Sequence, residues 1–104
     1  MINIINLKHS KPVKEYDAVV DRTSKLGNPF YMKSEAERDN VCDKYIEYFY
    51  RNIQASGSFK TEVNRLVDLY KKHGHLNLFC WCAPKRCHAE TIRKYIYYRI
   101  REDS

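Results

Sequence analysis

The chain has 104 residues, which is enough for one domain, residues 1–104, with one modest hydrophobic core. Hydrophobic residues make up 43% of it and charged residues 31%, and no window approaches the ~18 consecutive apolar residues of a membrane helix, so the composition excludes both a disordered chain and a membrane-spanning one. The formal net charge of +6 favours an anionic partner, such as a nucleotide or a nucleic acid, although many basic proteins share it.

Two strands are predicted near the start of the chain. Residues 2–7, INIINL, are short and rich in β-branched side chains, and residues 16–23, YDAVVDRT, form a second run of this kind. The next residues, SKLGNPFYM, break the pattern, because Gly27 permits unusual backbone angles and Pro29 restricts the residue before it. We therefore expect a loop after the second strand.

Two helices are predicted next. Ser34 and Glu37 form the pattern of a capping box, which starts a helix that runs to about residue 54. Apolar residues at three- and four-residue steps give this helix one buried face. A second helix follows a turn at residues 55–58 and ends at Gly74, with basic residues in its last turn.

The last third of the chain contains a strand and a helix. Residues 75–82, HLNLFCWC, alternate with period two and are apolar on both faces, which indicates a central strand covered on two sides. Pro84 ends this strand, and a last helix begins around Cys87 or His88. The predicted order is thus β-β-α-α-β-α. The fold class expected from this order is α/β, a small single-domain sandwich in which helices pack on a short sheet.

Two polar segments follow predicted strands, residues 21–30 (DRTSKLGNPF) and residues 80–90 (CWCAPKRCHAE). Ligand sites in α/β sheets lie beyond the carboxyl ends of the strands, where such loops gather. We therefore expect the two segments to contact each other and to form one site.

Together, the two segments resemble an uncharacterised family of phage, bacterial and archaeal proteins, the domain of unknown function 4326 family. The motifs R-x-S-x-x-G-N-P-F and C-x-C-x-P-x-x-C-H match in order and spacing, and the resemblance runs from about residue 20 to residue 92. The matching residues are Arg22, Ser24, Gly27, Asn28, Pro29 and Phe30, then Cys80, Cys82, Pro84, Cys87 and His88. Ala89-Glu90 departs from the Gly-Asp that the family more often has. The resemblance implies a shared fold, a shared polar site and a phage-type protein, and it implies no reaction.

The cysteine-rich segment allows three interpretations, of which the first is a metal site. The first residues of the chain lack the order of a signal peptide, so we expect a cytoplasmic protein (in the host cytoplasm if it is viral) whose thiols stay reduced. Cys80, Cys82, Cys87 and His88 supply the Cys3His ligand set of structural zinc. However, Cys80 and Cys82 on an extended strand would hold their sulfurs apart, unlike the turns of zinc ribbons and fingers.

The second interpretation is a reactive thiol. Cys87 near the start of the last helix, beside Lys85, Arg86 and His88, is placed to favour its thiolate form. His88 would then serve as a general base. The candidate catalytic residues are therefore Cys87 and His88, and the sequence leaves open whether the protein is an enzyme.

The third interpretation, which we favour, is a phosphate-binding loop. Amides at the start of the last helix, together with basic side chains, would bind the phosphate of a nucleotide or a nucleic acid. His88 and Glu90 would hydrogen-bond to the loop at residues 27–28. The ligand-binding residues expected on this interpretation are Arg22, Ser24, Gly27, Asn28, Lys85, Arg86, His88 and Glu90.

A protein that binds and modulates a host or cellular protein is the alternative function. The chain has nine tyrosines, and Tyr48, Tyr50, Tyr97 and Tyr98 fall outside the predicted buried faces of the helices. Exposed tyrosine is typical of interfaces, and homodimerisation would use the same side chains. On this alternative the cysteine cluster is structural or binds zinc.

Overall fold

Three short strands and three α-helices make up the part of the chain that the structure describes, residues 1–103 of this computed structural model. In chain order the elements are β1 (Ile2–Asn6), β2 (Asp17–Val19), the 3-10 turn η1 (Glu35–Glu37), α1 (Arg38–Gln54), α2 (Ser58–His73), β3 (Leu76–Cys80) and α3 (Ala89–Glu102). The order β-β-α-α-β-α and the α/β class that the sequence predicts are confirmed. No helix within residues 1–103 is long and apolar enough to cross a membrane.

The sheet is parallel throughout, and β3 is its central strand. β1 pairs with all five residues of β3, and β2 pairs with three of them, with Asp17 opposite Asn77. All five residues of β3 are buried, as expected for a strand covered on both faces. Because the strands are parallel, their carboxyl ends meet at one edge of the sheet. The loops at residues 20–34 and 81–88 both begin at this edge.

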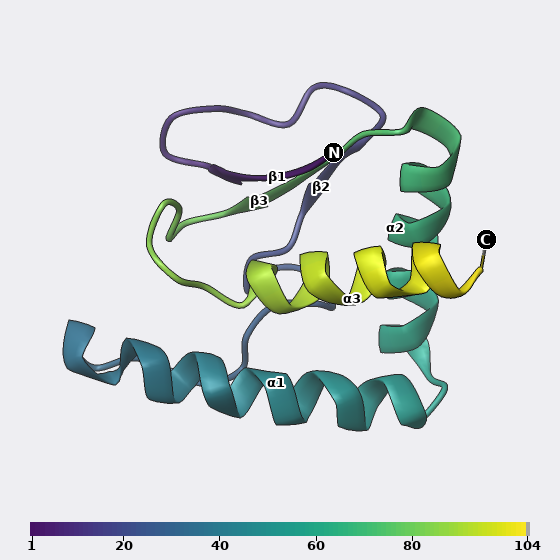
Figure 1. The fold of residues 1–104 in the computed structure, drawn as a ribbon. Coiled ribbons are helices and arrows are strands. Elements are labelled where there is room, and N and C mark those ends of the chain that lie inside the picture. Colours follow the sequence, from purple (N-terminus) through teal and green to yellow (C-terminus); the bar gives the residue numbers. More distant parts are fainter. Residues whose placement is uncertain (104) are drawn as a thin grey trace.

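All three helices lie on one side of the sheet (Figure 1). α3 lies between the sheet and α1, and α2 packs against both of the other helices (Figure 1). The hydrophobic core forms where these layers meet, and burying each large apolar side chain there contributes roughly 1.5–3 kcal/mol relative to leaving it exposed. Its fully buried members include Leu76 and Leu78 from β3, Tyr45 and Phe49 from α1, Leu66 from α2, and Ile92 and Ile96 from α3.

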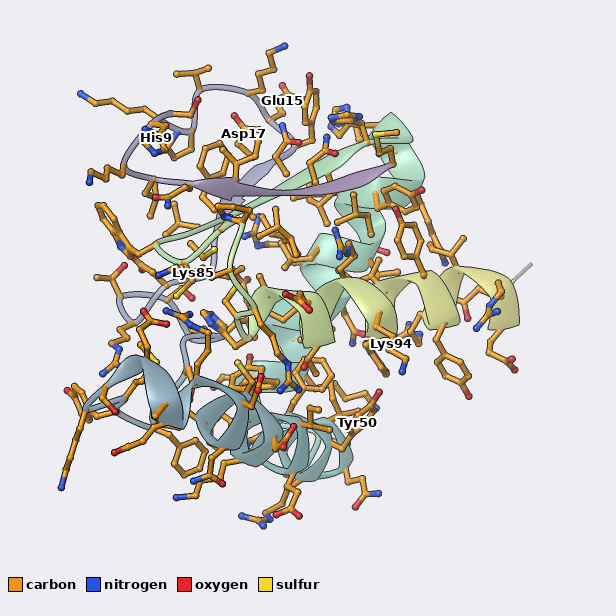
Figure 2. All side chains as sticks on the ribbon, turned by 60° about the vertical axis from the view of Figure 1, so that its left-hand side comes forward. His9, Glu15, Asp17, Tyr50, Lys85 and Lys94 are labelled. Carbon is orange, nitrogen blue, oxygen red and sulfur yellow. The ribbon has the colours of Figure 1, made fainter. Side chains whose placement is uncertain are left out.

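The other face of the sheet carries a row of polar side chains, one from each strand. Asn3 Nδ2 donates to Asn77 Oδ1 (3.2 Å), and Asn77 Nδ2 donates to Asp17 Oδ1 (2.8 Å). Asp17 Oδ2 accepts hydrogen bonds from the backbone N–H groups of Val13 and Lys14, both at 2.9 Å. This polar row therefore holds the segment between β1 and β2 on the side of the sheet that the helices leave free, where Figure 2 shows the Asp17 side chain.

Three boundaries differ from the sequence prediction. β2 ends at Val19 and not at residue 23, because the chain turns where the backbone N–H of Ser24 donates to Asp21 O (3.0 Å). β3 ends at Cys80, two residues early, and a turn follows. The predicted capping box is wrong, because Ser34 makes no side-chain hydrogen bond to the helix start, and η1 leads into α1 instead.

Candidate functional site

A cavity of about 300 Å³ opens at the carboxyl ends of β2 and β3. Its walls come from the loop after β2, the first turns of α1, and the loop after β3, and we call it the strand-end cavity. Its volume lies at the small end of the ~300–1,000 Å³ range of ligand pockets, which suits a small molecule. The residues that line it are Asp21, Arg22, Thr23, Asn28, Phe30, Met32, Arg38, Val41, Cys42, Trp81, Cys82, Arg86, Cys87 and His88.

Two side chains connect the two loops that the sequence predicts to meet. Trp81 Nε1 donates to Asp21 Oδ2 (2.9 Å), and the ring nitrogen Nε2 of His88 hydrogen-bonds the backbone oxygen of Val20. Burial acts to raise the pKa of Asp21, but hydrogen bonds from Thr23 and Trp81 outweigh it and keep this pKa below its usual value. Asp21 is therefore a carboxylate at neutral pH, and the contact between the loops is charge-assisted.

His88 is buried, with 8% of its surface exposed, and it is neutral at pH 7. A carbonyl oxygen can only accept, so the Nε2 atom that contacts Val20 carries the proton and Nδ1 does not. Burial lowers the pKa of His88 by more than the hydrogen bond to Val20 raises it. His88 also lines the cavity, so its Nδ1 atom is a candidate acceptor for a ligand there.

Ser24 and Gly27 shape the loop after β2 and do not line the cavity. Ser24 Oγ donates to Asp21 O (3.0 Å) and accepts from the backbone N–H of Leu26 (3.2 Å). A Cβ atom at position 27 would lie 2.4 Å from Asp21 O and 2.6 Å from Arg22 Cα, so only glycine fits there. The structure therefore gives these two motif residues a conformational role.

Asn28 offers the cavity a hydrogen-bond donor. Only 8% of its surface is exposed, and its Oδ1 atom accepts from the backbone N–H of Phe30 (2.9 Å). Within residues 1–103, its Nδ2 atom donates to no acceptor. This nitrogen is not sealed from solvent, because within residues 1–103 only His73 Nε2 is a fully buried side-chain nitrogen or oxygen without a partner. The Asn28 amide can therefore donate to a ligand or to water in the cavity.

Two of the three arginines at the cavity are paired with carboxylates. Arg38 Nε and Nη2 donate to the two oxygens of Glu35, at 2.9 and 2.8 Å, and the Arg38 guanidinium holds the pKa of Glu35 at about 2. Arg86 Nη1 donates to Asp39 Oδ1 (3.0 Å), and Arg86 Nη2 donates to Asp43 Oδ1 (2.8 Å). The protein itself therefore neutralises much of the charge of these two side chains.

Arg22 has no carboxylate partner within residues 1–103. Its Nη2 atom donates to Phe30 O (3.1 Å), and its guanidinium carbon stands 3.9 Å from the centre of the Tyr31 ring. This side chain is exposed at the cavity and keeps several donors free. Unlike Arg38 and Arg86, it can bind an anion without giving up an ion pair.

The thiols of the motif occupy different environments. Cys80 and Cys87 are buried, and their Sγ atoms lie 3.4 Å apart. Cys82 is half-buried and lines the cavity, and hydrogen bonds to Glu35 and to Cys82 raise the pKa of Arg38. Cys87 therefore lies against another thiol, whereas Cys82 lies beside the Arg38 guanidinium.

The structure does not assemble the ligand set expected for zinc. Among residues 1–103, no group of three or more His, Cys, Asp or Glu side chains is placed to hold a metal ion. Within the expected set of Cys80, Cys82, Cys87 and His88, the histidine uses Nε2 for a backbone carbonyl and two of the thiols contact each other.

The cluster of basic side chains expected around one phosphate is also not formed. Arg22 and Arg86 line the strand-end cavity, but Lys85 and Glu90 line a second cavity, of about 290 Å³, against α3 and β1. Lys85 Nζ lies 3.3 Å from Glu35 Oε1, and Glu90 Oε2 accepts a backbone N–H hydrogen bond from the turn before α3 (3.3 Å). The charge available to an anion is therefore smaller than the sequence suggests.

Arg38, Val41 and Cys42 of α1 line the cavity but lie outside the two predicted segments. Only the order of the elements along the chain indicates that these residues lie at the site. The loop after β2 leads directly into η1 and α1, so the first turns of this helix must lie near the carboxyl edge of the sheet.

Comparison with known proteins extends over nearly the whole fold. Residues 5–97 match the family model described as Domain of unknown function (DUF4326), and this range includes every residue that lines the strand-end cavity. No curated protein and no solved structure matches the chain. The description of the family states no activity, so a function has to be argued from the cavity.

Proposed function

The chain belongs to the family described as Domain of unknown function (DUF4326), and from this premise we propose that the strand-end cavity binds a nucleotide. Arg22 binds its phosphate at the cavity mouth, and the apolar part of the cavity takes its base. The carboxyl edge of a parallel sheet is where α/β proteins bind such ligands.

The observation that carries the proposal is the guanidinium of Arg22, which has no carboxylate partner within residues 1–103, together with the Asn28 Nδ2 group, which donates to no acceptor in those residues. Both lie on the loop after β2, and both line the same cavity. A phosphate oxygen would accept from Arg22, and a hydrogen bond to a charged group contributes about 1.5–3 kcal/mol. Asn28 Nδ2 would donate to a second acceptor of the ligand.

The remaining walls suit a planar heterocycle. Phe30 and Trp81 offer aromatic surface, and stacking of a base on such a ring contributes about 1–3 kcal/mol. A nucleobase edge carries both donors and acceptors, and Asn28 Nδ2 and His88 Nδ1 provide one of each to pair with them. The cavity is small and local, which favours a mononucleotide over a strand of nucleic acid.

Isothermal titration of the purified protein with the four ribonucleoside monophosphates tests the proposal. We expect one of them to bind, and Arg22→Ala to weaken its binding by about 10- to 100-fold, because a charged hydrogen bond of about 1.5–3 kcal/mol is lost. Arg51→Ala is the matched control, since Arg51 is an exposed arginine at the far end of α1, and it should bind as tightly as the wild type.

Two outcomes would contradict the proposal. One is that no monophosphate binds at millimolar concentration. The other is that Arg22→Ala and Arg51→Ala bind equally well. Binding of single-stranded oligonucleotides that weakens steeply with salt and is indifferent to Arg22 would instead assign recognition to a basic surface elsewhere.

A second candidate function, binding to another protein, is favoured by an aromatic patch away from the cavity. Tyr50 of α1 and Tyr98 of α3 are 42% and 48% exposed, and both pack against the ring of Tyr95. Figure 2 shows Tyr50 beside α1, on the side of this helix that faces α3. Of the other tyrosines expected on the surface, Tyr97 is exposed, and Tyr48 packs against the core. If the patch joins two copies of the chain, sedimentation should show a dimer that Tyr50→Ser converts to a monomer.

A further inference from the structure

Cys80 and Cys87 form a thiol pair that nucleotide binding does not require. Cys80 is the last residue of β3, and Cys87 lies in the turn before α3, so the pair joins the two elements that flank loop 81–88. Their Sγ atoms are 3.4 Å apart, and the side chains are among the most buried of the chain, with residue exposures of 1% and 4%. No other two thiols within residues 1–103 are in hydrogen-bond contact.

The surroundings of Cys80 favour a negative charge on its sulfur. Its Sγ atom is in hydrogen-bond contact with the Cys87 thiol, and the backbone N–H groups of Cys82 and Ala83, where the chain turns after β3, also stabilise a negative charge on it. These hydrogen bonds lower the pKa of Cys80 against the opposing effect of burial. The hydrogen bond with Cys80, together with burial, raises the pKa of Cys87. Once the pair has lost one of its two protons, the remaining proton lies between two sulfurs 3.4 Å apart, so the pair forms a thiolate more readily than an isolated buried cysteine would.

The strand-end cavity gives small molecules a route to this pair. Cys87 lines the cavity, as do Cys82 of the same loop and Cys42 of α1. A molecule of the size of hydrogen peroxide fits easily into about 300 Å³. The pair is thus buried from bulk solvent and reachable from the cavity.

We propose that Cys80 and Cys87 are a redox-active dithiol, which a small hydroperoxide entering the strand-end cavity converts to a disulfide. The proposal goes beyond nucleotide binding and does not depend on it.

The chemistry needs only the two thiols and the peroxide. Transfer of the shared proton to Cys80 leaves Cys87 as the thiolate at the cavity wall. Its sulfur attacks one peroxide oxygen, so that an S–O bond forms, the O–O bond breaks, and hydroxide leaves and takes the proton of Cys80. The Cys80 thiolate then attacks the Cys87 sulfur, the S–S bond forms, and the S–O bond breaks to release a second hydroxide, which solvent protonates. The two sulfurs lose two electrons, and the peroxide is reduced to two molecules of water.

Disulfide formation would alter the strand-end cavity. An S–S bond is about 2.05 Å long, so the sulfurs must approach each other from their present contact distance of 3.4 Å. Cys80 is fixed at the end of the central strand, so Cys87 makes most of this movement. Cys87 lies between Arg86 and His88, which both line the cavity, so the oxidised protein should bind cavity ligands with a different affinity.

The spacing of basic residues makes the linkage easy to map. Trypsin cleaves after Lys72, Lys85, Arg86 and Arg93, which places Cys80 and Cys82 in the peptide 73–85 and Cys87 in the peptide 87–93. Cys42 falls in a third peptide, residues 39–44. Folded protein is treated with an equimolar amount of hydrogen peroxide, its remaining thiols are alkylated, and it is digested without reductant and analysed by tandem mass spectrometry.

We expect peptides 73–85 and 87–93 to be linked through Cys80, and dithiothreitol to abolish the link. The matched variants are Cys82→Ser, which should retain the link, and Cys80→Ser, which should lose it. If Cys80→Ser does not fold, fragmentation of the linked wild-type peptide still decides between Cys80 and Cys82. Oxidation confined to Cys42 or Cys82, a link that Cys82→Ser removes, or reduced Cys80 and Cys87 after treatment would each overturn the proposal.

Discussion

The two loops that wall the strand-end cavity differ in how many of their hydrogen bonds are local. The loop after β2 has several within itself: Ser24 Oγ donates to Asp21 O, and Asn28 Oδ1 accepts from the N–H of Phe30. All of these partners lie within three positions of each other in the sequence. This loop is therefore shaped in part by its own residues, and hydrogen bonds from Tyr45, Trp81 and His88 complete its anchoring.

The loop after β3 is fixed by distant residues. Asn6 Nδ2 of β1 donates to the backbone oxygens of Trp81 (3.3 Å) and Ala83 (2.8 Å). Arg38 Nη1 of α1 donates to the backbone oxygen of Arg86 (2.9 Å). The shape of this loop therefore depends on the sheet and on α1 being in place. We call the loop after β2 the first loop and the loop after β3 the second loop. A substitution within the first loop should lower the free energy of unfolding through steric conflict. A substitution of a distant partner should loosen the second loop selectively.

Gly27→Ala should have the largest effect, because it forces a methyl group into the backbone of the locally held loop. The added Cβ would lie 2.4 Å from Asp21 O, and backbone atoms cannot move aside as the end of a flexible side chain can. We expect the free energy of unfolding, measured with urea, to fall by about 3 kcal/mol. The control is Gly57→Ala, where no atom lies within 4 Å of the added Cβ, and the loss should stay below about 1 kcal/mol. Equal losses would show that the first loop is not sterically fixed.

Asn6→Ala should have an intermediate effect, because it removes both hydrogen bonds from β1 to the second loop. We expect a loss of about 2 kcal/mol in the free energy of unfolding. Trp81, the only tryptophan of the chain, lies in this loop. The tryptophan fluorescence of the folded variant, at urea concentrations below the unfolding transition, should therefore differ from that of the wild type.

Asn52→Ala is the control for Asn6→Ala. It also removes a side-chain hydrogen bond to a backbone oxygen, Asn52 Nδ2 to Tyr48 O (2.8 Å), but within α1. It should leave the Trp81 fluorescence of the folded protein unchanged. If Asn6→Ala leaves that fluorescence unchanged as well, the second loop does not depend on β1.

The smallest effect concerns His88, which joins the two loops, and it depends on pH. Burial lowers the pKa of His88 in the folded protein, so below about pH 6.5 the unfolded chain takes up a proton that the folded chain resists. The stability contributed by neutral His88 is therefore complete above about pH 6.5, falls as the pH decreases below that value, and levels off below the folded pKa. We expect the melting temperature to decrease from pH 7 to pH 5, and to decrease less in His88→Gln.

His9→Gln is the control for this prediction, because His9 is exposed and Figure 2 shows it on the segment after β1, on the side of the sheet away from the helices. It should keep the pH dependence of the wild type. A slope that is the same in His88→Gln and the wild type would assign the pH dependence to other groups.

The features predicted from the sequence are those that depend on local pattern and on strand direction. Alternation of apolar residues identified β3 as the buried central strand, and two loops that follow parallel strands had to meet at one edge. Gly27 and Asn28 stood out because the backbone there is restricted. The contact between Asp21 and Trp81 follows from this placement.

The features that were not predicted depend on residues far apart in the sequence. Lys85 and Arg86 were both expected at a phosphate, but Arg86 pairs with Asp39 and Asp43, more than 40 positions earlier. Period-two alternation placed Cys80 and Cys82 together on an extended strand. Because β3 ends at Cys80, the chain turns and brings Cys87 to it instead. The alternation of residue types along the sequence does not predict the residue at which a strand stops pairing.

The central position of β3 has a consequence for the order of events during synthesis. β1 and β2 are made first, but each pairs only with β3, which is complete about 60 residues after β2. At ~5–20 residues per second, the ribosome needs roughly 3–12 s to pass from residue 19 to residue 80. In this interval the two early strands have no partner, and α1 and α2 are the elements that can already pack against each other. The nascent chain therefore holds two unpaired strands until β3 emerges and receives both of them at once.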